Sequence, residues 1–334
     1  MRLREHPATE PPRPAPAFAP RVSVVICTYT ERRLHNTYRA VESALRQSYL
    51  PHEVILVVDH NPLLYRRLER FLGDRVRVIN FQHGERGAVS ADNAGIEAAT
   101  GDIVAFMDDD AHASRRWLER LVEHYQNADV AASGGRLVPL WDGGRPWWFP
   151  EELDWVVGCT HRGHPEHRCE IRNLVLCNMS VRRDVFQAAG GFAPGLGRRR
   201  NWGTGAEAEF FLRARERLPG SRVLFDPEAV VYHHVSPGRA RLGYVILRSY
   251  NEGYHKALIQ HRYAAGGDTL TTERSYLRSL VASVLGRLAG AYRPANLGRV
   301  AVILLSVAAT GAGYLVARAR LALLRPGNDT GNQE

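Results

Sequence analysis

Short apolar runs alternate with amphipathic stretches along the first part of the chain. Three runs have the length and apolar character of buried strands: residues 21–30, 53–61 and 102–107. Residues 75–80 predict a further, shorter strand, which is the third along the chain. Helical spacing of apolar or small residues marks the segments between and after them: residues 34–45, 64–72, 88–100 and 118–125. This alternation predicts an α/β fold, with a mostly parallel sheet and helices on both of its faces.

Polar residues end three of the predicted strands. Thr28 and Tyr29 end the first run, Asp59 ends the second, and the aspartate triplet 108–110 follows the fourth. Because ligands of open α/β sheets bind beyond the carboxyl ends of the strands, we expect these residues on one rim. Gly87, after the third strand, would let the backbone approach a ligand closely.

The aspartate triplet indicates a positively charged partner. Three adjacent carboxylates repel one another, and carboxylate oxygens suit Mg²⁺ or Mn²⁺, which proteins often share with substrate phosphates. One carboxylate could hold the metal while another binds a ribose hydroxyl, and Asp59 could accept a hydrogen bond from a base or ribose. The alternative is a solvated acidic turn. The surrounding order of strands favours a site for a metal and a nucleotide.

The composition is that of a folded globular protein with an anionic partner. The 334 residues are 45% hydrophobic and 24% charged, with a formal net charge of +9. A phosphorylated small molecule or an acidic membrane surface would suit this charge. Nucleic acid is not an expected partner, because no basic stripe with interleaved aromatic residues is present. The four cysteines form no disulfide framework, which favours a reducing compartment.

Several motifs, in order along the chain, resemble one enzyme family. The stretches VSVVICTYTERR, EVILVVDHN, RGAVSADNAGIEAATGDIVAFMDDDA and WLERL are together similar to the family-2 inverting nucleotide-sugar glycosyltransferases, which have a GT-A fold. The similarity covers residues 21–257. WDGGRPWWFPEELDWVVGCTHRG and LCNMSVRRDVFQAAGGF further resemble an actinobacterial and archaeal subgroup described as glucosyl-dolichyl-phosphate glucuronosyltransferase-like.

The resemblance implies a nucleotide-sugar site on the predicted rim. Asp108 and Asp110 would frame the metal–diphosphate site, with Asp110 as the direct ligand of Mg²⁺ or Mn²⁺. One departure is that Ala91-Asp92-Asn93 stands where the family commonly has Ala-Arg-Asn. Loss of that arginine removes a phosphate or sugar contact and leaves the identity of the donor open. The residues expected to bind the donor are Thr28, Tyr29, Glu31, Asp59, Gly87, Asn93, Asp108 and Asp109.

The second half of the chain is expected to supply the acceptor side and the catalytic base. In AEAEFFLRARERL, the family's acidic pair aligns with Ala206 and Glu207, which implies that Glu207 takes the acceptor proton. The alternative is that Glu207 and Glu209 only favour a helix N-terminus. FDPEAVVYHHV predicts a strand ending in two histidines. The family places a histidine near the metal here, and His233 matches better than His234; a packed or surface histidine is the alternative.

Two features in the middle of the chain leave alternatives open. CTHRGHPEHRC contains residue types that bind zinc, but their spacing matches no usual zinc motif, and a mobile active-site loop is favoured. Nearby tryptophans could stack on a sugar, enter a membrane interface or pack the insertion onto the sheet. They are Trp141, Trp147, Trp148 and Trp155.

The C-terminal region differs in kind, because residues 300–317 contain no charge over 18 positions. This length is short for a membrane span, and alanine and glycine dilute its hydropathy. A span, an interfacial helix or hairpin, and a soluble packing helix all remain open. Membrane contact is favoured, and it would suit a polyprenyl-linked sugar as acceptor. Another glycan or a small molecule is the alternative acceptor. The expected location is cytoplasmic, at the inner face of the cell membrane.

The predicted architecture is a GT-A domain followed by a helical tail. A proline-rich, disordered lead of residues 1–20 precedes a domain of residues 21–260, and a membrane-associating helical tail covers residues 270–325. Within the domain, residues 21–135 form the nucleotide-sugar and metal half, and residues 136–260 form the acceptor half. The function predicted is metal-dependent, inverting transfer of a sugar to an acceptor hydroxyl.

Two other functions remain as alternatives. A sugar nucleotidyltransferase would carry a glycine-rich loop after its first strand, and CTYTERRLHN has no glycine. A sugar-nucleotide-binding protein without transferase activity stays open because of Asp92 and Ala206.

Overall fold

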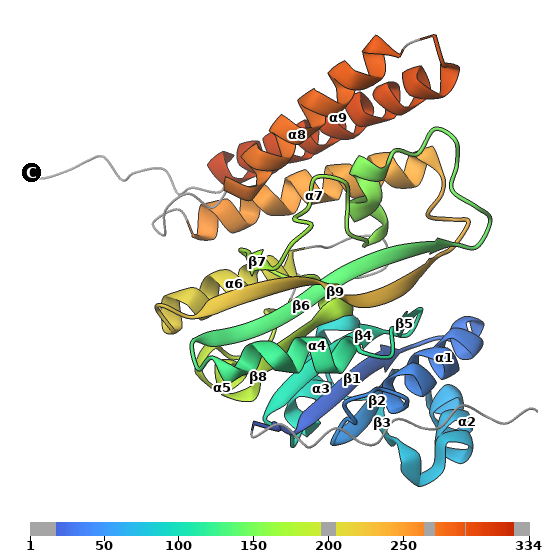
Figure 1. Cartoon of the computed structure of the whole chain (residues 1–334), viewed down its shortest axis with the longest axis vertical. Coiled ribbons are helices and arrows are strands. Elements are labelled where there is room, and N and C mark those ends of the chain that lie inside the picture. Colours follow the sequence, from blue (N-terminus) through green and yellow to red (C-terminus); the bar gives the residue numbers. More distant parts are fainter. Residues whose placement is uncertain (1–17, 195–204, 264–270, 291, 324–334) are drawn as a thin grey trace, which may run out of the picture.

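One nine-stranded sheet organises the computed structural model, which describes residues 18–194, 205–263, 271–290 and 292–323. The strand order is β3-β2-β1-β4-β8-β6-β9-β5, with β7 paired to β9 (Figure 1). β3, β2, β1 and β4 are parallel, whereas β8 runs antiparallel to both β4 and β6. The first half of the sheet is therefore parallel and the second half mixed. The strands are β1 (Val22–Thr28), β2 (Glu53–Asp59), β3 (Arg77–Phe81), β4 (Ile103–Asp108), β5 (Ala111–Ala113), β6 (Val130–Trp141), β7 (Cys169–Glu170), β8 (Met179–Arg182) and β9 (Arg222–Val235).

Helices cover both faces of the sheet, as the alternation predicts. α1, α2 and α4 pack on one face, and α3, α5 and α6 on the other (Figure 1). Most of residues 1–20, the predicted lead, lie outside the described residues. The helices of these layers are α1 (Leu34–Leu45), α2 (Pro62–Leu72), α3 (Ala88–Ala98), α4 (Trp117–Glu123), α5 (Arg183–Ala189) and α6 (Ala206–Arg217), with the short 3-10 helices η1 (Glu31–Arg33), η3 (His124–Gln126), η4 (Glu151–Val157) and η5 (Leu176–Asn178).

Local sequence explains where α2 begins and how closely α3 packs on the sheet. α2 begins at Pro62 directly after Asn61, whose side-chain oxygen accepts the backbone N–H of Leu64 at 3.1 Å. α3 lies so close to β1 that a Cβ on Gly95 would be 2.3 Å from the nearest methyl carbon of Val25. Gly95 thus allows α3 to pack directly against the middle of β1.

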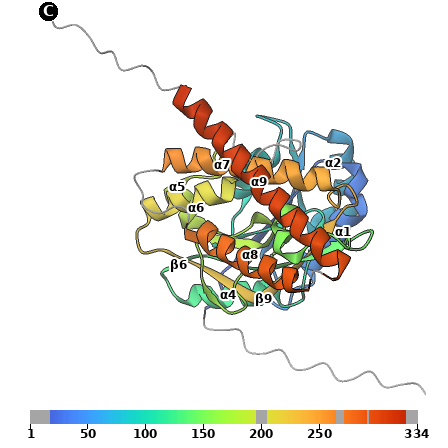
Figure 2. The ribbon, with the colours of Figure 1, turned by 90° about the horizontal axis from the view of Figure 1, so that it is seen from above.

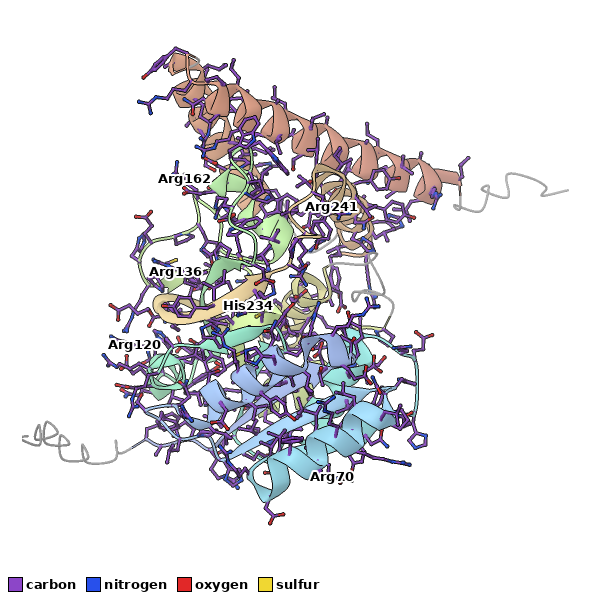
Figure 3. The ribbon with its side chains drawn as sticks, turned by 90° about the vertical axis from the view of Figure 1, so that its right-hand side faces the viewer. Arg70, Arg120, Arg136, Arg162, His234 and Arg241 are labelled. Carbon is purple, nitrogen blue, oxygen red and sulfur yellow. The ribbon has the colours of Figure 1, made fainter. Side chains whose placement is uncertain are left out.

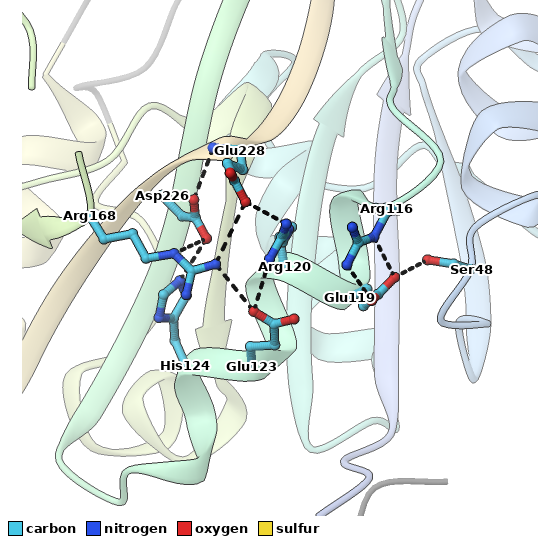
Figure 4. A network of polar contacts seen from close by, with 9 residues as sticks. All are labelled: Ser48, Arg116, Glu119, Arg120, Glu123, His124, Arg168, Asp226 and Glu228. Atoms are coloured by element: carbon cyan, nitrogen blue, oxygen red, sulfur yellow. Dashed lines mark hydrogen bonds and ion pairs between the residues drawn. The ribbon is translucent and has the colours of Figure 1, made fainter. Parts of the chain in front are cut away.

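A polar network away from the rim ties α4 and η3 to β9 (Figure 4). Asp226 is fully buried, and its Oδ2 lies 2.9 Å from Arg168 Nε and 3.2 Å from His124 Nε2. Arg120 of α4 lies 2.5 Å from Glu228 of β9. These contacts also anchor the end of the segment 159–169, so this part of the Cys- and His-containing stretch has a structural role.

Three helices form a separate layer at one end of the molecule (Figures 1 and 2). They are α7 (Leu242–Arg262), α8 (Thr271–Ala289) and α9 (Pro294–Leu323). The predicted tail corresponds to α8 and α9, although residues 270, 324 and 325 lie outside the described residues. α9 is long and apolar enough to cross a membrane: its most apolar 18-residue window has a mean hydropathy of 2.1 and is 33% buried.

Candidate active site

The ends of β1 and β4 bring two predicted donor residues into direct contact. Cys27 pairs in register with Asp108, which places Thr28 beside Asp109. Thr28 Oγ1 donates to Asp109 Oδ2 at 2.7 Å, and Arg33 of η1 donates to Asp109 Oδ1 at 2.8 Å. Thr28 and Asp109 are only 1% and 3% exposed. These hydrogen bonds fix Asp109, and with it the aspartate triplet, at the end of β4.

Asp110 is the acid best placed to bind a cation. It is 5% exposed, and its Oδ1 has no hydrogen-bond partner but lies 3.3 Å from His233 Nε2. The antiparallel pairing of β5 with β9 causes this approach, because it sets Ala111 opposite His233. Burial alone would raise the pKa of Asp110, but His233 and then Arg239 and Arg33 hold that pKa below its ordinary value.

Three side chains beside Asp110 offer a set of donor atoms. One atom each from Asp108, Cys177 and His233 lies within 4.8 Å of the others. Cys177 comes from η5, and the sequence pattern did not indicate it. The carboxylates of Asp108 and Asp110 and the imidazole of His233 fit a divalent cation. Carboxylate oxygens suit Mg²⁺ or Mn²⁺.

Glu207 and Glu209 have different surroundings at the start of α6. Glu207 is partly buried near the triplet; burial and, to a smaller extent, the charge of Asp108 raise its pKa. Glu209 is fully buried and accepts hydrogen bonds from Arg213 at 2.9 and 3.0 Å and from the Tyr263 hydroxyl at 2.6 Å. Positions two apart on a helix point in directions roughly 200° apart, which separates the two environments.

Asp92, in the place of the family's arginine, adds another acid to the rim. It is 5% exposed, on α3, and contacts the Cys27 thiol. Burial raises its pKa to about 8, with further contributions from the charges of Asp108, Glu207 and Asp59. Asp92 is therefore mainly protonated at neutral pH.

Two arginines from elsewhere in the chain supply positive charge at the triplet. Arg33 NH1 lies 3.1 Å from Asp110 Oδ2, and Arg239, just after β9, lies 3.4 Å from the same oxygen. Arg239 also lies 3.3 Å from His233 Nε2. The sequence reasoning missed both. The only available signal was that each closely follows a predicted strand end.

The end of β2 gathers further predicted donor residues. Asp59 Oδ2 accepts the backbone N–H of Gly87 at 3.1 Å, and Gly87 has a φ of +150° that favours glycine. Tyr29 is 46% exposed and available to a ligand. Glu31 Oε1 accepts from the amide of Asn61 at 3.0 Å. These contacts connect the loops after β1, β2 and β3 into one rim.

Asn93 and His234 are held by other parts of the protein. The Asn93 side chain accepts the Phe192 N–H at 2.8 Å and donates to the Phe192 carbonyl at 2.9 Å. It also lines a cavity of about 560 Å³ together with Arg183 and Arg213, away from the triplet. His234 points to Asp142, with Nδ1 at 3.0 Å, so His233 is the histidine that faces the triplet.

The segment 159–169 touches the site at one end only. Cys159 Sγ lies 3.7 Å from His233 Nδ1, whereas Cys169 pairs with Phe225 of β9. Among the residues that the structure describes, the Cys and His side chains of this segment form no group able to hold a metal. Of the nearby tryptophans, Trp147 is 61% exposed, while Trp141, Trp148 and Trp155 pack against the core.

Comparison with known proteins identifies relatives of this arrangement. A family model described as "Glycosyl transferase family 2" matches residues 23–190. The glucosyl-dolichyl phosphate glucuronosyltransferase of Haloferax volcanii is 37% identical over 302 residues, which cover 88% of this chain and 95% of the relative. The succinoglycan biosynthesis protein ExoM of Rhizobium meliloti is 27% identical over 237 residues, covering 70% and 72% of the two chains.

Solved structures confirm the predicted GT-A fold. The mannosyltransferase PcManGT from Pyrobaculum calidifontis, in complex with GDP-Man and Mn²⁺, has a TM-score of 0.54 and 19% sequence identity, covering 93% of this chain and 89% of its own. GalNAc-T7 with UDP, GalNAc and Mn²⁺ has a TM-score of 0.51 at 18% identity, covering 79% of this chain and 55% of its own.

Proposed function

This chain belongs to glycosyl transferase family 2 and is a glycosyltransferase, and we propose that it transfers a sugar from a nucleotide-sugar to a lipid-linked acceptor with inversion at the anomeric carbon. The observation that carries the proposal is the shared rim of Asp108, Asp110, His233 and Glu207. It sets a cation-binding group beside a carboxylate able to accept a proton. Family membership favours transfer over the two alternatives, a nucleotidyltransferase and a binding protein without activity.

We assign the diphosphate end of the donor to the triplet. Asp110, Asp108 and His233 would hold Mg²⁺ or Mn²⁺, and Cys177 borders the same space. When bound, such an ion stabilises the negative charge of the departing nucleoside diphosphate. Arg33 and Arg239 supply further positive charge, in place of the arginine that Asp92 replaces.

Of the other residues expected to bind the donor, some would contact the nucleotide and others would position those that do. Asp59 and Glu31 would accept hydrogen bonds from the nucleoside, and the exposed Tyr29 would stack on its base. Gly87 would let the backbone approach the nucleotide. The supports, which position these groups from inside the protein, are Thr28, Asp109 and Asn93.

Glu207 is assigned as the general base. Its carboxylate, at the start of α6, would accept the proton of the acceptor hydroxyl while that oxygen attacks the anomeric carbon and the diphosphate leaves. A raised pKa makes the carboxylate of Glu207 a stronger base. The charge of Asp108 contributes to that rise, so Glu207 lies near the residues assigned to the diphosphate of the donor. One displacement from the opposite side inverts the configuration. We accordingly assign residues 21–135 to the donor and residues 136–260 to the acceptor.

The acceptor and sugar are proposed from the relative in Haloferax volcanii. Its name makes glucosyl-dolichyl phosphate the first acceptor to test and glucuronosyl the first sugar. A lipid-linked acceptor requires the enzyme to work at a membrane, and α9 provides an apolar helix there. We propose that it acts at the cytoplasmic face.

The test uses the full chain in detergent with a panel of UDP- and GDP-linked sugars, including UDP-glucuronic acid. Glucosyl-dolichyl phosphate is the acceptor, and each reaction is run with Mn²⁺ or with chelator. Release of nucleoside diphosphate together with a glycosylated lipid, in which NMR shows the inverted anomeric configuration, is expected. Retained configuration would refute the single displacement. Donor hydrolysis without lipid product across a wider acceptor panel would refute the lipid-linked acceptor.

A further inference from the structure

The outer surface of α8 and α9 carries large apolar side chains that no other part of the described chain covers. We call six of them the roof face. Leu304 and Leu315 of α9 are 57% and 68% exposed, and Val281 and Leu285 of α8 are exposed to a similar extent. Figures 1 and 2 show both helices above α7, on the side away from the sheet. The roof face is Leu277, Val281, Leu285, Leu297, Leu304 and Leu315.

The opposite side of α9 is packed tightly against α7. A Cβ on Gly253 would lie 1.9 Å from the Thr310 carbonyl oxygen, and one on Gly313 would lie 2.0 Å from the Tyr250 carbonyl oxygen. Small residues therefore let the two backbones touch. Ser249 Oγ of α7 also lies 2.8 Å from a buried serine hydroxyl of α9.

α8 is fastened to the rest of the protein by polar contacts. The Tyr276 hydroxyl donates to the Glu152 carbonyl at 2.7 Å and accepts from Trp155 Nε1 at 2.8 Å. Arg287 reaches both carboxylate oxygens of Glu152 at 2.8 Å, and Glu152 is 1% exposed. The inner side of α9 is thus packed against α7, and the inner side of α8 is bonded to η4 of the catalytic domain.

This attachment is incompatible with α9 crossing a bilayer alone. Because α9 touches α7 backbone to backbone, insertion of α9 would draw α7 into the hydrocarbon as well. α7 carries Arg248, Glu252 and Lys256, which form ion pairs with one another, and Lys256 also reaches Glu273 of α8 at 3.1 Å. Charges of this kind are costly within a bilayer. Figure 3 shows α9 lying across the top of the molecule, with Arg241 below it.

The exposed charged side chains of α8 and α9 are all arginines, and Glu273 of α8 is partly buried and paired with Arg172. Residues 274–323 contain seven arginines and no lysine, aspartate or glutamate. Arg278 of α8 and Arg293, just before α9, are exposed, and so are Arg318 and Arg320 near the C-terminal end of α9. Arginines bordering an apolar strip are complementary to a bilayer of anionic lipids, where the apolar side chains enter the acyl region and the guanidinium groups meet phosphates.

We propose that α8 and α9 bind an anionic lipid bilayer in the plane of its surface, through the roof face, and that neither helix spans it. This inference rests on the proposed function, since a lipid-linked acceptor lies in that bilayer. The geometry also relates the membrane to the chemistry. The charge of Arg248 on α7, the helix beneath α9, acts on Glu207 against the effect of burial, so the candidate base lies on the α7 side of the catalytic domain.

The first test is flotation of the full chain with phosphatidylglycerol-containing or pure phosphatidylcholine vesicles. Leu304→Asp with Leu315→Asp should weaken binding at least about tenfold, because two apolar anchors become charged. Leu63→Asp on α2, where Leu63 is 73% exposed, is the matched control and should bind like the unaltered chain. Equal loss in the control, or equal binding to both lipids, would overturn the proposal. The proposal would also be overturned if the full chain forms a dimer, the paired substitution separates that dimer, and vesicle binding stays unchanged.

A second test distinguishes an in-plane helix from a span. Arg293→Cys and Arg318→Cys place thiols near the two ends of the charge-free stretch, and sealed inverted membrane vesicles expose the cytoplasmic side. An impermeant maleimide should label both variants above the background of the native cysteines. Labelling of only one end would show a span. Because neither test measures transfer, normal membrane binding without lipid glycosylation would refute the proposed function and leave this inference standing.

Discussion

Exchanging Glu207 and Glu209 separately for glutamine should produce opposite phenotypes. Glu207→Gln keeps the shape of the side chain but cannot take a proton, so the rate of transfer should fall by about 10² to 10⁴. Affinity for the nucleoside diphosphate should remain, because Asp108, Asp110 and His233 are unchanged. Burial raises the pKa of Glu207, so its ionised form disfavours the fold above the ordinary carboxyl pKa. The melting temperature of Glu207→Gln at pH 7 should therefore equal or exceed that of the unaltered protein.

Glu209→Gln should instead lose stability. Its carboxylate accepts hydrogen bonds from Arg213 and Tyr263, and these partners hold its pKa low against the effect of burial. A lowered pKa contributes stability above the ordinary carboxyl range, which is lost as pH falls. Hydrogen bonds to charged groups are worth about 1.5–3 kcal/mol each, and glutamine keeps part of them, so the net loss should be about 2–4 kcal/mol. This corresponds to a melting temperature lower by roughly 5–15 °C.

The assay compares both variants at a temperature where each is folded, by transfer rate, by calorimetric binding of nucleoside diphosphate and by thermal unfolding. The rate of Glu207→Gln should also lose the acid limb of the pH profile, which in the unaltered enzyme should lie above the ordinary range of a carboxyl group. An inactive, stable Glu209→Gln beside an active Glu207→Gln would refute the assignment of the base. Full activity in both would place the base elsewhere.

Two further predictions concern the aspartates of the rim. Asp110→Asn should lower Mn²⁺ affinity and transfer at least about 100-fold, as followed by Mn²⁺ titration and activity, and unchanged Mn²⁺ binding would remove this ligand from the scheme. The stability advantage of Asp92→Asn over the unaltered protein should grow by about 3 kcal/mol as pH rises from 6 to 8. The unfolded chain ionises Asp92 in this range while the folded chain keeps it protonated, which costs the unaltered protein about 1.4 kcal/mol for each pH unit of rise up to a pKa of about 8. Parallel unfolding curves across that range would contradict the proposed surroundings of Asp92.

The order of elements and the position of the rim could be predicted from the sequence. Mostly apolar runs such as residues 22–28 are buried between other strands and helices, and parallel strands bring their carboxyl ends to one edge. Thr28, Asp59 and the triplet are therefore neighbours, as their places at strand ends predict. The mixed second half of the sheet was less predictable, because β6, β8 and β9 pair across long intervening segments.

Only the tertiary structure decided which way neighbouring side chains face. Asp109 and Asp110 are adjacent, yet one is used by Thr28 and Arg33 while the other keeps an oxygen unpartnered toward His233. Sequence position cannot reveal this, since the partners come from distant elements. The same holds for Arg239, which reaches the triplet because β9 pairs with β5.

The C-terminal helix shows the limit most clearly. Hydropathy identified residues 300–317 as apolar, and the glycines within them only reduced that signal. In the structure, Gly313 is where α9 meets the backbone of α7, while Leu304 and Leu315 remain on the outside. Apolar content depends on composition alone and can be read from the chain. Whether an apolar helix spans, packs or lies on a surface depends on which of its sides is already covered, and that is decided by packing against a helix some 60 residues away.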